Sequence, residues 1–351
     1  MAARMNEFYD SLTERERASF RDVALRYGRT LYPMYEILLS RKAASASPYY
    51  VGLSSETGSF THVTKRVVLV VDTMLLSDHG VGSVHELGMD SWDTSFSSLP
   101  GGEMPYEATH TQLYGMVTKD LVELGRWLLD AEPLLRSGLV WYGPVFMEGS
   151  RGTFDSNRHA VPPGPLPSFS DRSIDFVVEH GRAVDLSRVK PLASRVVRPI
   201  LDMDLPFMDG LSLVDFAKVT SDEFDSYTQF RDFMRSKLLE LDDALEAVDS
   251  QVAMERIALS IRDELNAATA EMNKAARSRA LARSGAVLGS TSAVLAAVRP
   301  EALQGALATS ATLAAGATGL WPTIQAFADI KPKRSHGKWH YVWVLQRAVR
   351  G

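Results

Sequence analysis

Residues 284–328, SGAVLGSTSAVLAAVRPEALQGALATSATLAAGATGLWPTIQAFA, decide how the C-terminal part of this chain folds. They contain only two charged residues, Arg299 and Glu301, which flank a proline and divide the stretch into two uncharged runs, 284–298 and 302–328. Both runs consist largely of Ala, Gly, Ser and Thr with scattered Leu and Val. Two such runs joined by a polar turn predict a helical hairpin, either buried in the protein or able to enter a bilayer.

Small residues recur at every fourth position of both runs, which lets helix backbones approach closely. The first run is shorter than the about 20 residues that span a bilayer, and tightly packed helices buried in protein would have the same spacing. Burial and engagement of a membrane or of partner helices therefore both stay open. The contact residues we expect are Gly285, Gly289, Ala293, Ala297, Ala302 and Ala306, with Lys331, Lys333 and Arg334 as a basic flank.

The charge distribution points in the same direction. The chain has 351 residues and a net charge of −5, yet residues 274–351 contain only two acidic residues, Glu301 and Asp329, among many Lys and Arg. A basic tail on an acidic body either folds back on that body or meets an anionic surface. No apolar signal segment is visible at the N-terminus, so we expect a cytoplasmic protein, peripheral to the inner membrane or conditionally inserted in it.

The first half of the chain predicts an α/β part. Thr13 and Glu16 have capping-box spacing ahead of an amphipathic pattern. The run Arg66–Asp72, RVVLVVD, predicts a buried parallel strand, and Leu139–Met147 predicts a second strand. Between them, we expect a loop over 77–105 and a helix over 109–131. The two strands with a helical connection are compatible with a small parallel sheet.

The second half predicts helices. Ser212 with Asp215, and Thr220 with Glu223, have the spacing of helix starts. Apolar residues then follow a coiled-coil-like heptad from Met234 onward, which allows self-association but does not require it. Alternation in Trp339–Leu345, WHYVWVL, predicts a final strand.

The predicted fold class is therefore α+β and predominantly helical. It has an α/β domain over 1–204 and a helical domain over 205–351. The helical domain contains the hairpin 284–328 and a strand over 339–345.

Few residues suggest chemistry. The absence of cysteine excludes disulfides and thiolate sites, and we expect no cofactor. Asp78, His79 and His85 crowd one polar segment and are candidates for metal ligands. Asp72, followed by Thr73, resembles the opening of PIN-type nucleases, whose first strand ends in Asp-Thr or Asp-Ser. That resemblance implies a metal-dependent nuclease centred on Asp72, with Glu123, Asp175 and Asp185 as further acidic positions.

Three stretches resemble patterns in uncharacterised bacterial proteins of actinobacterial type. They are LPFMDGLSLVDFAKV from Leu205, FRDFMRSKLLEL from Phe230, and PLLRSGLVWYGP from Pro133. This resemblance implies architecture more than function. Long helices that lead into an Ala/Gly hairpin also resemble the hydrophobic hairpins of colicin-like pore formers.

The leading hypothesis is a non-enzymatic interaction or effector protein. Its small-residue hairpin would engage an anionic membrane or a protein partner, whereas nucleic acid is a poor match for an uncharged hairpin. The alternative is the PIN-like nuclease centred on Asp72.

Overall fold

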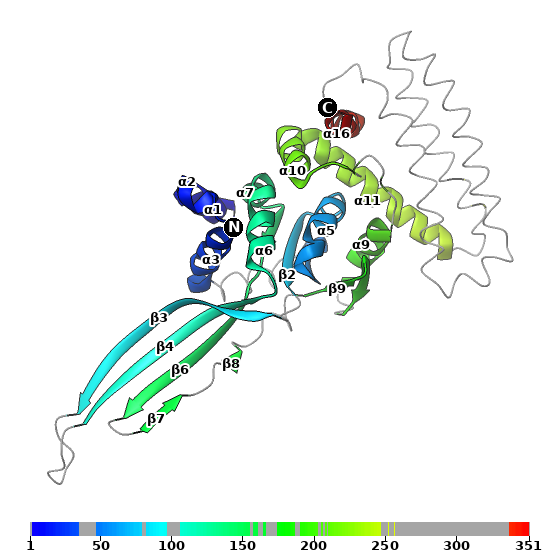
Figure 1. Ribbon diagram of the computed structural model, residues 1–351. Coiled ribbons are helices and arrows are strands. Elements are labelled where there is room, and N and C mark those ends of the chain that lie inside the picture. Colours follow the sequence, from blue (N-terminus) through cyan, green and yellow to red (C-terminus); the bar gives the residue numbers. More distant parts are fainter. Residues whose placement is uncertain are drawn as a thin grey trace. The chain divides into compact units, whose positions relative to one another are not determined.

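The chain adopts an α+β fold in the computed structural model (Figure 1). The structure describes residues 2–34, 47–78, 82–96, 106–154, 157–160, 164–165, 174–186, 190–202, 205, 208, 210–246, 252, 256 and 337–350. The predicted hairpin 284–328, with all its contact residues, lies outside the described residues. The basic flank of Lys331, Lys333 and Arg334 and the metal candidate His79 also lie outside them.

Two compact units make up the chain. The first contains residues 1–46, 52–60 and 75–177, and the second contains 47–51, 61–74 and 178–351. The division predicted between residues 204 and 205 stays a prediction.

The first unit begins with three helices, α1 (Ala2–Ser11), α2 (Glu14–Arg17) and α3 (Phe20–Leu31). The predicted capping box is confirmed, because the Glu16 amide donates to the Thr13 side chain while the Thr13 amide donates to the Glu16 carboxylate. α3 packs on α6 (Leu121–Asp130), which α7 (Glu132–Ser137) follows. Fully buried aromatic rings form the core here, and two of them also donate hydrogen bonds, Tyr9 to the Leu128 carbonyl and Tyr27 to the Tyr142 carbonyl.

A mixed five-stranded sheet confirms the small sheet expected in the N-terminal part. Its strand order is β10 (Arg182–Asp185), β9 (Phe176–Glu179), β1 (Tyr50–Ser55), β2 (Thr73–Asp78) and β5 (Val140–Tyr142). The starts of β1 and β2 meet where the Asp72 amide donates to the Tyr49 carbonyl. Their ends meet where the Ser54 hydroxyl donates to the Asp78 carbonyl. The two strands therefore run parallel, joined by η2 (Thr57–Ser59) and α5 (Phe60–Val67).

The strand predicted over Arg66–Asp72 is wrong. Residues 66–67 end α5, residues 68–71 form a buried turn, and the strand starts one residue after Asp72. Val67, Val68, Leu69, Val70 and Val71 are each at most 1% exposed. The run is apolar because all of its residues are buried, whatever their conformation. A short segment that is apolar throughout has no periodicity, so its sequence does not distinguish a strand from a helix end and a turn.

A second, antiparallel sheet replaces the loop predicted over 77–105 and the first half of the helix predicted over 109–131. β3 (Ser83–Phe96) pairs with β4 (Tyr106–Thr118), which pairs with β6 (Val145–Phe154), and Figure 1 shows the three strands side by side as a long ribbon. The short strands β7 (Asn157–Ala160) and β8 (Gly164–Pro165) both pair with β6. The predicted strand over Leu139–Met147 is confirmed as β5 and the start of β6, which are separated at Gly143 and Pro144.

Besides most of α5, the described part of the second unit contains α9 (Pro191–Asp202), α10 (Leu213–Asp222), α11 (Phe224–Glu246) and α16 (Lys338–Arg350). Ser212 caps α10 as predicted, by accepting a hydrogen bond from the Asp215 amide. Thr220 instead lies inside α10, where its hydroxyl donates to the Phe216 carbonyl, so the second predicted cap is wrong.

The strand predicted over 339–345 is also wrong, because these residues belong to α16. Tyr341, Val342 and Leu345 are fully buried, and their spacing is that of one helix face. The described C-terminal part therefore ends in a helix rather than returning to a sheet.

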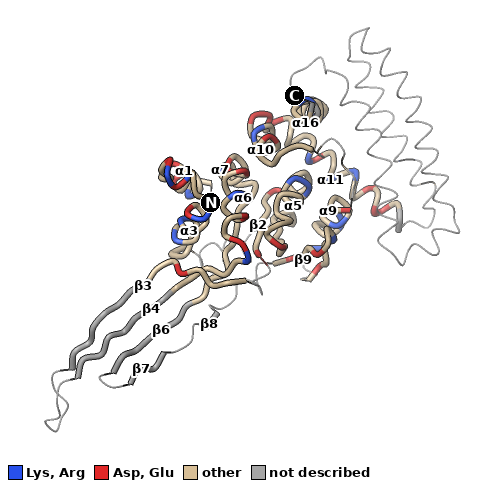
Figure 2. Tube along the Cα trace, viewed as in Figure 1, with Lys and Arg blue, Asp and Glu red and all other residues tan. Residues whose placement is uncertain are grey.

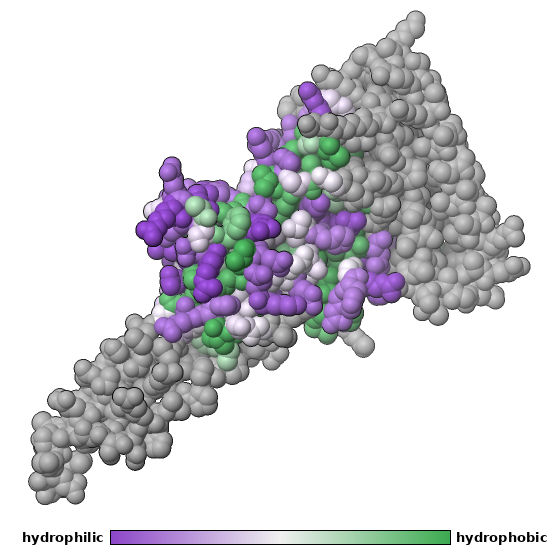
Figure 3. Space-filling model, viewed as in Figure 1, coloured by the Kyte–Doolittle hydropathy of each residue, from purple (hydrophilic) through white to green (hydrophobic). Residues whose placement is uncertain are grey.

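The described surface is mixed in character. Figure 2 shows Lys and Arg interspersed with Asp and Glu along the described helices, and the face drawn in Figure 3 has apolar side chains in small patches among polar ones. Among the described residues, no helix is both long enough and apolar enough to cross a membrane.

The contact between α3 and α6 gives a stability prediction. A Cβ at Gly125 would lie 1.8 Å from the Phe20 carbonyl oxygen, whereas one at Gly58 would lie 3.5 Å from its nearest neighbour, a Glu123 oxygen. Gly125→Ala should therefore destabilise the fold by about 2–3 kcal/mol through overpacking. Gly58→Ala is the control and should change stability by less than about 1 kcal/mol. Urea unfolding of both variants measures the difference, and equal stabilities would contradict the close α3–α6 packing.

Candidate functional site

One face of α11 holds the turn that precedes β2. Tyr227, Arg231 and Arg235 are spaced by four residues, so they line the same side of the helix. The Tyr227 hydroxyl donates to the Val68 carbonyl at 2.8 Å, and Nε of Arg235 donates to the Val70 carbonyl at 3.1 Å. Buried carbonyls that strand pairing does not satisfy thus receive side-chain donors, which is what a buried turn requires.

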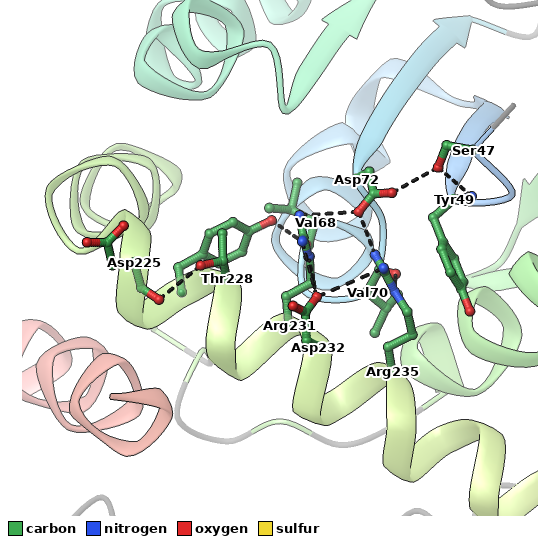
Figure 4. A network of polar contacts seen from close by, with 11 residues as sticks. Ser47, Tyr49, Val68, Val70, Asp72, Asp225, Thr228, Arg231, Asp232 and Arg235 are labelled. Carbon is green, nitrogen blue, oxygen red and sulfur yellow. Dashed lines mark hydrogen bonds and ion pairs between the residues drawn. The ribbon is translucent and has the colours of Figure 1, made fainter. Parts of the chain in front are cut away.

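Asp72 lies at the end of this turn and completes the contact (Figure 4). Its Oδ1 accepts from Arg235 at 2.9 Å and lies 3.3 Å from an Arg231 nitrogen, while its Oδ2 accepts from the Ser47 hydroxyl at 2.8 Å. The Arg235 guanidinium also lies over the Tyr49 ring, 3.7 Å from the ring centre. We call Asp72, Arg231 and Arg235 the arginine clamp.

The environment of Asp72 stabilises the ionised form of its carboxyl group. Burial alone would raise the pKa of the Asp72 carboxyl. Hydrogen bonds from Arg235 and Ser47, together with the charges of Arg235 and Arg231, outweigh burial and lower this pKa below its ordinary value. The carboxylate is therefore ionised at neutral pH and contributes to holding α11 against the turn.

This geometry suits a structural role. Both Asp72 oxygens interact with donors from the protein, and the residue lies at the start of β2, whereas ligands in open α/β sheets bind at the carboxyl ends of the strands. Within the described ranges, no group of three or more His, Asp or Glu side chains could hold a metal ion. The structure thus surrounds Asp72 with cations where the nuclease hypothesis needs further carboxylates.

The carboxyl end of β2 carries a different polar cluster. Asp78 is only 4% exposed, and its Oδ2 accepts from the Thr57 hydroxyl at 2.5 Å and the Thr118 hydroxyl at 3.0 Å. The Lys119 amide approaches the same oxygen at 3.5 Å. A ring nitrogen of His85 lies 3.3 Å from the Thr118 carbonyl. Two of the three predicted metal candidates, Asp78 and His85, therefore both contact Thr118.

The further acidic positions of the nuclease hypothesis are dispersed, since Glu123 and Asp175 lie in the first unit and Asp185 ends β10 in the second. Asp175 accepts a hydrogen bond from the Gly52 amide at 2.7 Å, which fixes the chain beside β1. Glu123 lies beside Gly58, the residue after Thr57. Only Glu123 therefore approaches the Asp78 cluster.

A third arrangement fixes α16 on α10 and α11. The Tyr341 and Thr220 hydroxyls are hydrogen-bonded at 2.8 Å in the buried interface, and Nε2 of His340 lies 3.3 Å from a Glu223 oxygen. The Gly337 amide donates to the Ser226 hydroxyl at 3.2 Å. α16 thus starts beside the first two turns of α11, and we call the three helices α10, α11 and α16 the helical platform.

The comparisons with models of protein families, with curated proteins and with solved structures found no match. Assignment of a role therefore rests on the three arrangements above.

Sequence reasoning missed the clamp arginines, although a signal was present. Arg231 and Arg235 lie four residues apart beside the apolar residues of this helix, and Tyr227 lies four residues before Arg231. This spacing indicates a shared partner but cannot identify Asp72 more than 150 residues away in the chain.

The arginine clamp predicts a pH-dependent loss of stability. Asp72→Asn should destabilise the fold by about 1 kcal/mol at pH 7, a value that allows for solvent screening of the half-exposed carboxylate. Because the folded-state pKa is lowered, this contribution is present above the unfolded pKa of about 3.9. It is lost as pH falls through the folded value, so variant and wild type should converge in acid.

Asp232→Asn is the matched control, since Asp232 pairs with the same arginines but its side chain is 61% exposed. It should cost less than about 0.5 kcal/mol. Urea unfolding at several pH values measures both variants, and a loss for Asp72→Asn that does not depend on pH would exclude the ionic role.

Proposed function

We propose that this chain is a non-enzymatic interaction or effector protein that acts through residues 247–336, which the helical platform holds at both ends. The segment contains the two uncharged small-residue runs and the basic flank of Lys331, Lys333 and Arg334. Its target in this proposal is an anionic membrane or the helices of a protein partner, and no cofactor is required.

The platform geometry carries the proposal. α11 ends at Glu246, and the Gly337 amide, one residue before α16, donates to the Ser226 hydroxyl in the first turn of α11. These two positions are about 30 Å apart along one helix, at 1.5 Å per residue. The described residues that precede and follow the segment therefore both belong to the helical platform.

The composition of the segment supports a binding role. Small residues at every fourth position allow close helix packing against another helix or in a bilayer. The adjacent lysines and arginine favour an anionic surface, with about 1 kcal/mol per basic residue near a membrane that contains anionic lipid.

The nuclease alternative has no specific observation in its favour. It keeps a direct test, because metal-dependent RNA cleavage that Asp72→Asn abolishes would support it. In our proposal, the same substitution affects stability only.

Membrane engagement can be measured by co-sedimentation with vesicles of phosphatidylglycerol and phosphatidylcholine. The wild-type chain should bind, and binding should weaken at high salt because screening reduces the attraction between basic residues and the surface. Reversal of Lys331, Lys333 and Arg334 to Glu should weaken binding by at least about tenfold at low salt. The control reverses Arg15, Arg21 and Arg26, three exposed arginines of the N-terminal helices, and should leave vesicle binding almost unchanged.

Replacement of residues 247–336 by a Gly/Ser linker of about 30 residues tests the segment itself, since such a linker reaches about 30 Å. The replaced chain should unfold as cooperatively as the wild type but lose vesicle binding. Equal binding by this variant would contradict the proposal.

A further inference from the structure

The two edges of the five-stranded sheet differ. At the β5 edge, the Tyr27 hydroxyl accepts a hydrogen bond from the Tyr142 amide and donates one to the Tyr142 carbonyl, so a side chain covers the backbone there. At the other edge, β10 has a single neighbour among the described strands, β9. An edge strand of this kind can pair with another chain, and proteins commonly block such edges with lysine or proline. β10 contains neither residue.

Exposed apolar side chains lie at the same edge. Val184 in β10 is 54% exposed, and Leu186, which follows the strand, is 58% exposed. These are the two most exposed large apolar side chains of the described residues. The side chain of Ala183, by contrast, is buried, as expected from the alternation of faces along a strand. The edge strand therefore presents an apolar residue at its centre.

The turn before β10 determines which of its backbone groups point away from β9. The turn consists of His180 and Gly181, whose φ angles are +51° and +79°, and positive φ at both positions is typical of a type I′ hairpin turn. In such a hairpin, the residues that flank the turn, Glu179 and Arg182, form a hydrogen-bonded pair. The N–H and C=O groups of Arg182 therefore point toward β9. Because the direction alternates along a strand, those of the next residue, Ala183, point away from it.

This alternation defines how β10 can pair with β10 of a second copy of the chain. A two-fold axis at Val184 places Ala183 of each copy opposite Asp185 of the other, and both residues direct their backbone groups outward. Two hydrogen-bonded pairs then flank a close pair of Val184 side chains, one from each copy. Arg182 lies opposite Leu186 of the other copy, where its aliphatic stem can cover the leucine.

The charges of β10 favour this axis over its neighbours. An axis at Arg182 or at Asp185 would place two like charges directly opposite each other, which destabilises strand pairing. An axis at Ala183 would place Asp185 opposite Gly181, which belongs to the turn and does not continue the strand. Only the axis at Val184 pairs strand residues on both sides and keeps like charges apart.

We propose that the chain forms a weak homodimer in which two β10 strands pair antiparallel about a two-fold axis at Val184. The pairing joins the two five-stranded sheets into one continuous sheet. Because β10 has only four residues, the interface is smaller than the about 1,200 Å² that stable complexes bury, and we expect a Kd of about 10–100 µM. This interface is independent of residues 247–336 and of the proposed function.

Sedimentation velocity of the full chain from about 2 to about 500 µM tests the dimer. The wild type should pass from monomer to dimer over this range. Val184→Lys and Val184→Glu each place two like charges opposite each other and should weaken dimerisation by about tenfold or more. An equimolar mixture of the two variants should dimerise again, because lysine then faces glutamate. A wild type that stays monomeric, or a mixture that does not dimerise, would overturn the proposal.

Val214→Lys is the matched control, since Val214 is a valine of similar exposure, 49%, on α10. It should dimerise as the wild type does, and a loss equal to that of Val184→Lys would contradict the β10 interface.

A cross-link keeps the test decisive if a charged variant does not fold. The chain contains no cysteine, so Val184→Cys introduces a single thiol. Directly opposite residues of a close pair have Cα atoms about 4.5 Å apart, which suits a disulfide. Diamide, which takes up the two protons and two electrons of the two thiols, should therefore link Val184→Cys into a dimer on a non-reducing gel. Val214→Cys should stay monomeric, and equal cross-linking of the two variants would contradict the axis at Val184.

Discussion

The ion pairs between Asp72 and the two arginines of α11 are the contacts on which the arrangement of the second unit depends. Through them, Ser47 in the chain before β1, the start of β2 and one face of α11 are joined in a single network (Figure 4). α11 in turn packs against α16, where the buried rings of Tyr227 and Tyr341 are in contact. Loss of the clamp would therefore disturb the helical platform.

The two carboxylates at the ends of β2 have different environments and different consequences. Asp72 precedes the strand, is half-exposed and is paired with two cations, so its charge contributes to holding the fold. Asp78 ends the strand, is buried and accepts hydrogen bonds from two threonine hydroxyls. The two ends of one parallel strand thus place their carboxylates in different surroundings, one among cations and one among hydroxyl and amide donors. The sequence alone directed attention to Asp72 because the boundaries of the strand were predicted several residues too early.

Local signals predicted the structure where local interactions decide it. The capping pairs of Thr13 with Glu16 and of Ser212 with Asp215 are short-range contacts, and both were predicted correctly. The helix expected over 109–131 was correct only from Leu121 onward. Apolar residues at helical spacing continue back to Leu113, but pairing with β3 and β6 makes that part a strand and Asp120 caps the helix. Residues 339–345 fit both a strand and a helix pattern, and burial against α11 decides for the helix. The arginine clamp and the Asp78 cluster join residues distant in sequence, which no pattern within one segment specifies.

A double-mutant cycle between Asp72 and Arg235 tests the central claim most directly. Asp72→Asn, Arg235→Gln and the double variant are unfolded in urea at pH 7, and the coupling free energy is taken from the four stabilities. Our account predicts a favourable coupling of about 1 kcal/mol that falls as salt is added. Additive effects, with a coupling within about 0.3 kcal/mol of zero, would contradict the claim that this ion pair holds α11 in place.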